Sequence, residues 1–255
     1  MRYRVVIDAP APLRDTLSAS VDLVRWQTYE DMTPSLFEAL VRQANDQAKE
    51  AAATEGFFSA SVDIAVDRST TPWNVGIAVK TGPQARVAHA NINVEGAAAT
   101  DAAGVETIAV VKREWPLAPG VPFRQPAWIG AKSQAVRTLA GDAFAAAKLS
   151  STEAIVDPDT NSVDLQVTID SGPVFHVGDL DIEGLSRYTP DLVRNYRSRR
   201  SGDRYSIAEL DQFVRRLNGT GYFASVHAAI DTDPAKAAEA PVHVAVIEAP
   251  PKKIE

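Results

Sequence analysis

Cysteine is absent from this chain of 255 residues, which excludes disulfide bonds and thiolate metal sites. The absence fits any compartment and suits an exported bacterial protein. No apolar run approaches the ~20 residues that a membrane helix needs. The first ten residues, "MRYRVVIDAP", lack the hydrophobic region of a secretory signal peptide, so we expect any signal to have been removed or never to have existed.

Sequence motifs of catalysis and cofactor binding are missing too. The chain has no Gly-x-Ser-x-Gly elbow, no phosphate-binding glycine loop and no dinucleotide fingerprint. Asp157-x-Asp159-x-Asn161 begins like a calcium loop but lacks the later glycine and glutamate, so a polar turn is the better interpretation. We therefore expect no enzyme activity, no metal and no cofactor.

Histidine and arginine give weak signals only. The four histidines show no metal-ligand spacing, and we expect them on strand surfaces, with His227 and His243 able to pair across neighbouring strands. The net charge of −7 is spread almost evenly along the chain, unlike that of a nucleic-acid-binding protein. One basic cluster between two expected helices could contact phosphate or lipid, although a solvated loop is the simpler interpretation. It consists of Arg197, Arg199, Arg200 and Arg204.

What the chain does contain is a repeat. "VKTGPQARVAHANINVEG" (79–96) and "VTIDSGPVFHVGDLDIEG" (167–184) share a strand, a Gly-Pro turn and a second strand closed by Glu-Gly. The two Gly-Pro turns lie 90 residues apart, and the two closing glycines 88 residues apart. Self-similarity at one spacing is typical of repeated structural units. The sequence therefore predicts three domains, at residues 1–85, 86–174 and 175–255.

Each domain is expected to be α+β, with the order strand, helix, helix, strand, strand. In the third, Thr189-Pro190 begins a short helix, Ser206 and Glu209 form a capping box for the next one, and Asn218-Gly219 ends it. In the first, a helix over 13–24 precedes one that begins at Thr33-Pro34. In the second, the expected elements are helices over 102–111 and through 128–139, and a strand over 149–156.

A glycine followed by an aromatic residue stands where the second helix of the first and third domains meets the next strand, and Ala143-Phe144 is a weaker match in the second domain, with alanine in place of glycine. This feature resembles the signature of POTRA (polypeptide-transport-associated) domains, as does a Gly-x-x-aromatic segment at 120–123 and 202–205, which Trp26-x-x-Tyr29 replaces in the first domain. We expect Phe57, Phe144 and Tyr222 to be core residues. The signature residues are Gly56, Phe57, Phe144, Gly221, Tyr222 and Phe223.

The resemblance implies three tandem β-α-α-β-β domains, each with two helices on a three-stranded mixed sheet whose third strand is central. Three such units resemble the periplasmic region of Omp85-family outer-membrane assembly proteins, and "SGPVFHVGDLDIEG" and "LNGTGYFASV" resemble its TamA branch most. That similarity implies three kinds of partner: an inner-membrane-anchored TamB-like protein, unfolded outer-membrane or autotransporter clients, and a C-terminal β-barrel of the same protein.

The edge strand of each sheet then suits β-augmentation, in which an extended client adds a strand through main-chain bonds. In the first domain this edge is expected at Ser61, Val62, Asp63, Ile64, Ala65 and Val66. The alternatives are another Omp85 relative such as a two-partner secretion transporter, a cell-division POTRA protein, or, in a different class, a hydrolase with convergent carboxylates in a cleft.

Overall fold

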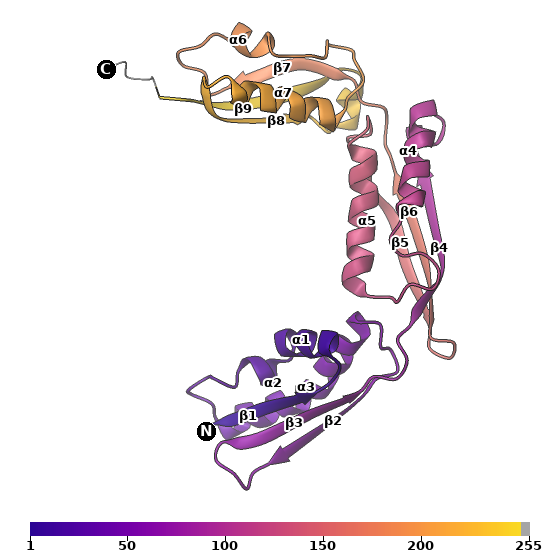
Figure 1. Cartoon of the computed structure of the whole chain (residues 1–255), viewed down its shortest axis with the longest axis vertical. Helices are drawn as coiled ribbons and strands as arrows, with labels where there is room; N and C mark the ends of the chain where they lie inside the picture. Colours follow the sequence, from indigo (N-terminus) through magenta and orange to yellow (C-terminus); the bar gives the residue numbers. More distant parts are fainter. Residues whose placement is uncertain (251–255) are drawn as a thin grey trace. The chain divides into compact units, whose positions relative to one another are not determined.

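The computed structural model describes residues 1–250, so the last five residues of the expected third domain lie outside it. The described chain repeats one order of elements three times, a strand followed by helices and two more strands (Figure 1). None of the helices in residues 1–250 is long and apolar enough to cross a membrane.

The first domain has three helices, because Val21 adopts an extended backbone that divides the single helix expected over 13–24. The next helix begins as expected, with the Thr33 hydroxyl accepting a hydrogen bond from the amide of Leu36 at 3.2 Å. The elements are β1 (Tyr3–Asp8), α1 (Ala11–Ser20), α2 (Asp22–Arg25), α3 (Pro34–Thr54), β2 (Ser61–Asp67) and β3 (Trp73–Lys80).

The first sheet has the order β1-β3-β2. β1 is parallel to β3, with Val5 opposite Val75, and β2 is antiparallel to β3, with Val62 opposite Val79. The third strand is therefore central, as the resemblance implied. The core between sheet and helices holds fully buried side chains from α1, α3 and β3, among them Leu13, Leu17, Phe37 and Ile77.

The second domain follows the expected order. Its elements are β4 (Arg86–Glu95), the 3-10 turn η1 (Ala97–Ala99), α4 (Ala102–Arg113), α5 (Gln125–Ala140), β5 (Lys148–Asp157) and β6 (Ser162–Asp170). The sheet order is β4-β6-β5, which again places the third strand in the centre. Both helices and the strand expected over 149–156 are confirmed. Leu139, Phe144, Leu165 and Ile169 are fully buried.

The third domain has the sheet order β7-β9-β8, with β7 parallel and β8 antiparallel to β9. Phe175, Val193, Leu217 and Val244 are among its buried core residues. Its elements are β7 (Val177–Glu183), α6 (Pro190–Arg194), α7 (Ile207–Gly219), β8 (Phe223–Ile230), the 3-10 turn η2 (Pro234–Glu239) and β9 (Ala240–Glu248).

The expected capping box of α7 is wrong. Ser206 is the N-cap residue but its side chain makes no capping bond, and the Glu209 carboxylate accepts a hydrogen bond from the Ser198 hydroxyl at 3.2 Å. The helix ends at Gly219, as expected, and the residue with positive φ that follows it is Gly221, at 74°.

The chain packs into two compact units, and the second domain contributes segments to both. One unit comprises Met1–Asn91, Pro116–Ala131 and Glu153–Leu165, and the other Ile92–Trp115, Lys132–Thr152 and Gln166–Glu255. The repeat predicted from the sequence is visible in the backbone. Gly82 and Gly172 both have φ 65°, and Gly96 and Gly184 have φ 89° and 90°.

Candidate functional site

β2 forms one edge of the first sheet, since it pairs with β3 on one side only. Its side chains alternate as the sequence predicts. Those that pack against the first core are Val62, Ile64 and Val66, and those that are exposed are Ser61, Asp63 and Ala65. An edge strand carries main-chain N–H and C=O groups that no neighbouring strand satisfies. β2 can therefore bond to an added strand through its backbone, and its part in client binding stays a prediction.

Helix α3 is tied to this edge strand at two points, neither of which the sequence pattern revealed. The Asn45 side-chain amide donates to the carbonyl of Val62 at 3.0 Å. Beyond the end of β2, Arg68 pairs with Glu38 at 2.6 Å. These contacts fix β2 beside α3, so the edge is held in an extended conformation before any strand is added.

The first strands of the second and third domains also lie at sheet edges, but loops cover their starts. The amide of Val87 donates to the carbonyl of Val121 at 2.9 Å, and the carbonyl of Val87 accepts from Gly120 at 2.8 Å. In the third domain, Val177 makes the same two bonds with Asp203 and Gly202, both at 2.8 Å. The Gly-x-x-aromatic segments thus act as short added strands, which gives this part of the POTRA signature a structural reason.

The first domain, which has Trp26-x-x-Tyr29 in place of the Gly-x-x-aromatic segment, lacks that cover. Trp26 and Tyr29 are 41% and 44% exposed and contact each other edge to face, with their ring centroids 5.3 Å apart. The amide of Val5 in β1 donates to the Gln27 side-chain oxygen at 3.3 Å rather than to a loop carbonyl. The cover of the first strand is therefore weaker here than in the other two domains.

The first residue of each signature pair has the same backbone conformation at the end of the helix. Gly56, Ala143 and Gly221 all have positive φ, at 86°, 65° and 74°, so the alanine adopts the glycine-like conformation. Phe144 is fully buried, as expected.

The aromatic residues of the other two domains are less uniform. Phe57 packs against the first core while only partly buried. Tyr222 is not a core residue: it is 40% exposed and contacts Tyr188, while Phe223 is buried instead. The expectation was wrong there because β8 begins at Phe223 and directs that side chain inward.

One linker residue at each joint bonds to both neighbouring domains through its main chain. The amide of Ala85 donates to the carbonyl of Gly56 at 2.9 Å, and its carbonyl accepts from Phe123 at 2.8 Å. Phe175 repeats this with Ala143 at 2.7 Å and Tyr205 at 2.9 Å. The helix end of one domain and the Gly-x-x-aromatic segment of the next are therefore connected in the same way twice.

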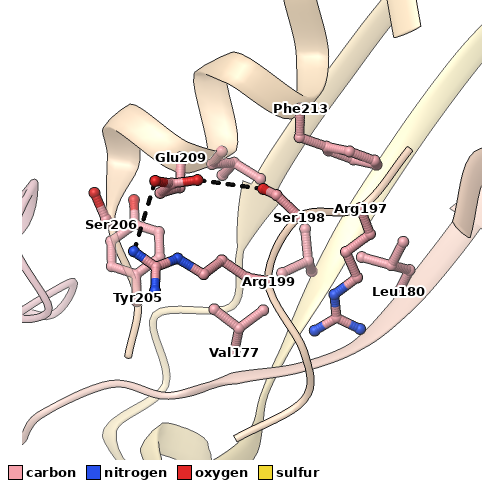
Figure 2. Close-up of a pocket in the computed structure, with 11 residues that line it drawn as sticks. Val177, Leu180, Arg197, Ser198, Arg199, Tyr205, Ser206, Glu209 and Phe213 are labelled. Atoms are coloured by element: carbon pink, nitrogen blue, oxygen red, sulfur yellow. Dashed lines mark hydrogen bonds and ion pairs between the residues drawn. The ribbon is translucent and has the colours of Figure 1, made fainter. Parts of the chain in front are cut away.

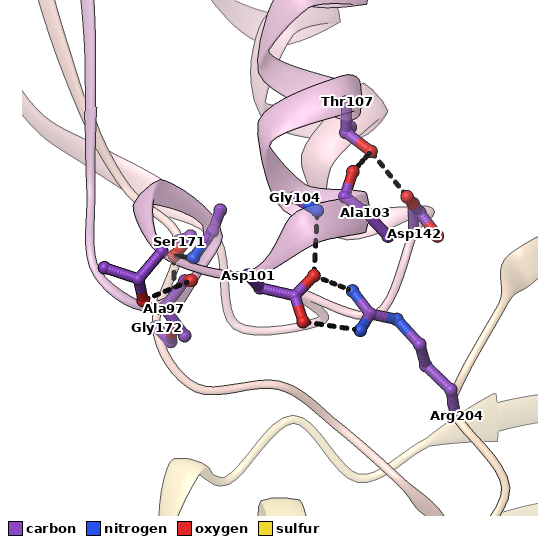
Figure 3. Close-up of polar contacts among 11 residues, drawn as sticks. Ala97, Asp101, Ala103, Gly104, Thr107, Asp142, Ser171, Gly172 and Arg204 are labelled. Atoms are coloured by element: carbon purple, nitrogen blue, oxygen red, sulfur yellow. Dashed lines mark hydrogen bonds and ion pairs between the residues drawn. The ribbon is translucent and has the colours of Figure 1, made fainter.

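An ion pair accompanies each of these joints. Arg204 donates two hydrogen bonds to the Asp101 carboxylate, at 2.9 and 2.8 Å, and the same carboxylate accepts from the amide of Gly104 at the start of α4 (Figure 3). The bonds from Arg204 and then Gly104 lower the pKa of Asp101 to about 2. Arg204 is thus not part of a free basic loop, because it links the second and third domains.

At the other joint, Arg124 donates to Glu55 at 2.6 Å, and the Thr16 hydroxyl donates to the same carboxylate at 2.8 Å. Glu55 is only 3% exposed. The hydrogen bond from Arg124 holds the pKa of Glu55 below its ordinary value, although burial alone would raise it. A buried carboxylate with a cationic partner suits a structural link rather than acid–base chemistry.

The remaining sequence candidates form no reactive site. Asp157 accepts hydrogen bonds from the amides of Asp159 and Thr160, as in a polar turn. His243 pairs with Asp181 at 3.1 Å rather than with His227. Within residues 1–250, no cluster of histidine, aspartate and glutamate has an arrangement that could hold a metal ion.

Comparison with known proteins agrees with this architecture. Residues 175–249 match the POTRA family, described as a surface antigen variable number repeat. The fold of the chain is similar to that of BamA POTRA domains 3–5 from Haemophilus influenzae, with a TM-score of 0.53 at 16% identity over 97% of this chain and 96% of that one.

A second similar structure is BamA from Haemophilus ducreyi lacking POTRA domains 1–3, with a TM-score of 0.50 at 16% identity. That match covers 64% of this chain and 29% of the other. No curated protein gives a significant match. The chain therefore consists of three tandem POTRA-like domains.

Proposed function

We propose that this chain is the POTRA region of an Omp85-family outer-membrane protein, and that it binds extended polypeptides by adding them to the open edge of β2. The observation that carries the proposal is the contrast between edges. Loops bond to the starts of β4 and β7, the first strands of the second and third domains, whereas β2, like β5 and β8 in the other two sheets, pairs with a strand on one side only.

Strand addition explains how one surface serves many clients. Main-chain hydrogen bonds supply the affinity, and they depend little on the client's sequence. The side chains of β2 that a client would meet on the outer face are small or acidic, namely Ser61, Asp63 and Ala65. Such a surface adds little side-chain selectivity, which suits the handling of unfolded outer-membrane proteins.

The TamA branch supplies the more specific form of the proposal. The segments at 171–184 and 217–226 resemble that branch, and a TamB-like protein anchored in the inner membrane is then the expected partner. The chain would act on the periplasmic side of the outer membrane as a scaffold without enzyme activity. Its net charge of −7, spread along the whole chain, does not indicate nucleic acid as a partner.

Amide hydrogen exchange tests strand addition directly. The whole chain would be mixed with an outer-membrane β-barrel protein diluted from urea, and exchange would be compared with that of the free chain. We expect slower exchange at alternate amides of residues 61–67, because an added strand accepts hydrogen bonds from every second residue. Protection confined to the helices, with β2 unchanged, would rule out strand addition at this edge.

Cross-linking provides a matched control, since the natural chain has no cysteine to interfere. Asp63→Cys places a photoreactive label on β2, and Val6→Cys places one on β1, on the opposite edge of the same sheet. Both positions are exposed. We expect label 63 to capture the unfolded barrel protein several times more often than label 6. Equal capture would show that binding is not confined to the β2 edge. Asp63→Ala should change the affinity little, because the backbone makes the contact.

A further inference from the structure

The third domain contains a small apolar pocket that is separate from the β8 edge of its sheet. It lies between α7 and β7, and the segment from Arg197 to Arg199 forms part of its mouth (Figure 2). Its apolar walls are supplied by Val177, Leu180, Leu210, Phe213 and Val242. Its free volume is ≈ 30 Å³, and a single water needs roughly 10–15 Å³ on this measure. The pocket therefore has room for the end of one apolar side chain and not for a lipid chain.

The mouth of this pocket is positively charged although the chain as a whole is acidic. The Arg197 guanidinium donates to the main-chain carbonyl of Gly178 at 2.7 Å, which fixes its position but leaves its charge uncompensated. Among residues 1–250, Arg197 forms no ion pair with a carboxylate. Arg199 approaches Glu209 only to 3.6 Å. The charge of Arg197 is thus available to an anionic group beside an apolar opening.

The segment over the mouth is attached to α7 by polar contacts alone. Ser198 donates to Glu209 at 3.2 Å and accepts from Arg216 at 2.9 Å. Exposed polar contacts of this kind are individually weak because water competes for the same groups. A ligand can therefore displace this segment slightly without disturbing the core beneath it.

We propose that this pocket is a second docking site, which receives one apolar side chain of an extended acidic polypeptide while Arg197 pairs with a flanking carboxylate. The small volume favours a side chain, and the uncompensated charge of Arg197 favours a carboxylate close to it. The site lies in another domain from β2 and uses no main-chain edge. The outcome of its test is therefore independent of the test of strand addition at β2.

Peptide titration of the whole chain tests the site. The probe is acetyl-Ser-Asp-Glu-Leu-Asp-Glu-Ser-amide, and its matched control carries serine in place of leucine. Methyl NMR signals of Val177, Leu180 and Val242 report on the pocket. We expect the leucine peptide to shift these signals and to bind roughly tenfold more tightly, as burial of one or two methyl groups would give. Equal binding of the two peptides would overturn the proposal.

Variants separate a local site from diffuse charge attraction. Arg197→Gln should weaken the leucine peptide about one-and-a-half- to fivefold, the range for a single exposed ion pair. Arg215→Gln removes the same charge from the exposed side of α7 and should leave binding unchanged. Equal losses in the two variants would contradict the proposal.

Two further outcomes are decisive. Leu210→Phe, which fills the pocket, should abolish the preference for leucine over serine while the melting temperature stays close to that of the natural chain. A retained preference would place the binding elsewhere.

Vesicles of 30% phosphatidylglycerol in phosphatidylcholine test a lipid surface instead. If these vesicles shift the pocket signals and the peptide does not, the occupant is not a polypeptide and the proposal fails.

Discussion

At the scale of single residues, the side-chain carboxylate of Asp101 makes contacts with two domains. It accepts from the amide of Gly104 at the start of α4, and it binds Arg204 of the third domain. Its pKa is lowered from 3.8 to about 2 in the folded chain. A carboxylate with a lowered pKa stabilises the folded state fully above its ordinary pKa, and this contribution is lost as the pH falls through the lowered value. The joint between these two domains should therefore loosen between about pH 4 and pH 2.

The variant Asp101→Asn tests this joint without removing the helix cap, since asparagine also accepts at an N-cap. Spin labels on cysteines at Glu106 and Arg215, both exposed, would measure the distance between the second and third domains. We expect a broader distance distribution for the variant at pH 7, and similar broadening of the natural chain near pH 2. A natural-chain distribution that stays unchanged down to pH 2, with circular dichroism intact, would contradict the assigned role.

A second residue-scale prediction concerns the positive-φ position at the helix end. A Cβ added at Gly56 would lie 2.2 Å from the main-chain oxygen of Phe123, and φ there is 86°. Gly56→Ala should therefore cost more than the roughly 1–2 kcal/mol of left-handed strain alone. Ala143→Gly relieves such strain but removes one buried methyl, so the two effects should nearly cancel. Urea unfolding measures both, and equal losses would show that the contact with Phe123 is not rigid.

At the scale of elements, the loop that covers β7 depends on a small turn. Asp203 accepts at its side chain from the amide of Arg200 at 2.7 Å, while its main-chain carbonyl accepts from Val177. Asp203→Ala removes the first bond and should weaken the second, so that the Val177 amide exchanges roughly two- to tenfold faster, as for the loss of one hydrogen bond. Asp203→Asn keeps an acceptor and should behave like the natural chain. Unchanged exchange in the alanine variant would show that the loop holds without this turn.

Elements of this chain could be predicted because their signals are local. Alternating apolar residues and the Thr33-Pro34 start lie within the segments they describe, and the structure confirms those strands and that helix. The predicted capping box does not form, and the Glu209 carboxylate has Ser198, outside the helix, as its partner. The first helix was drawn too long because helical spacing does not show that Val21 is extended.

The joints could not be predicted, for a related reason. Arg124 binds Glu55 across 69 positions of sequence, and Arg204 binds Asp101 across 103. Neither pair belongs to one element, so no periodic pattern connects them. The open edge of β2, by contrast, could be located, because the repeat and its resemblance to POTRA domains gave the strand order before any contact was known.

At the scale of the whole molecule, the chain repeats a joint as well as a domain. Ala85 and Phe175 make equivalent main-chain bonds to the domain before and the domain after them. Phe175 is fully buried and belongs to the third core, so the linker residue contributes to the stability of the domain that follows it. We therefore expect a domain boundary before residue 175, which a truncation can test.

Two fragments that differ by two residues provide that test. Residues 175–255 should unfold cooperatively and give dispersed amide signals, because they contain a sheet, two helices and the buried side chains of the third core. Residues 177–255 lose Phe175, and removing a buried phenylalanine side chain costs about 3–5 kcal/mol. This shorter fragment should be largely unfolded or melt at a much lower temperature. If the longer fragment is unfolded while the whole chain is stable, the third domain does not begin at residue 175. If both fragments melt alike, Phe175 serves the joint and not the core.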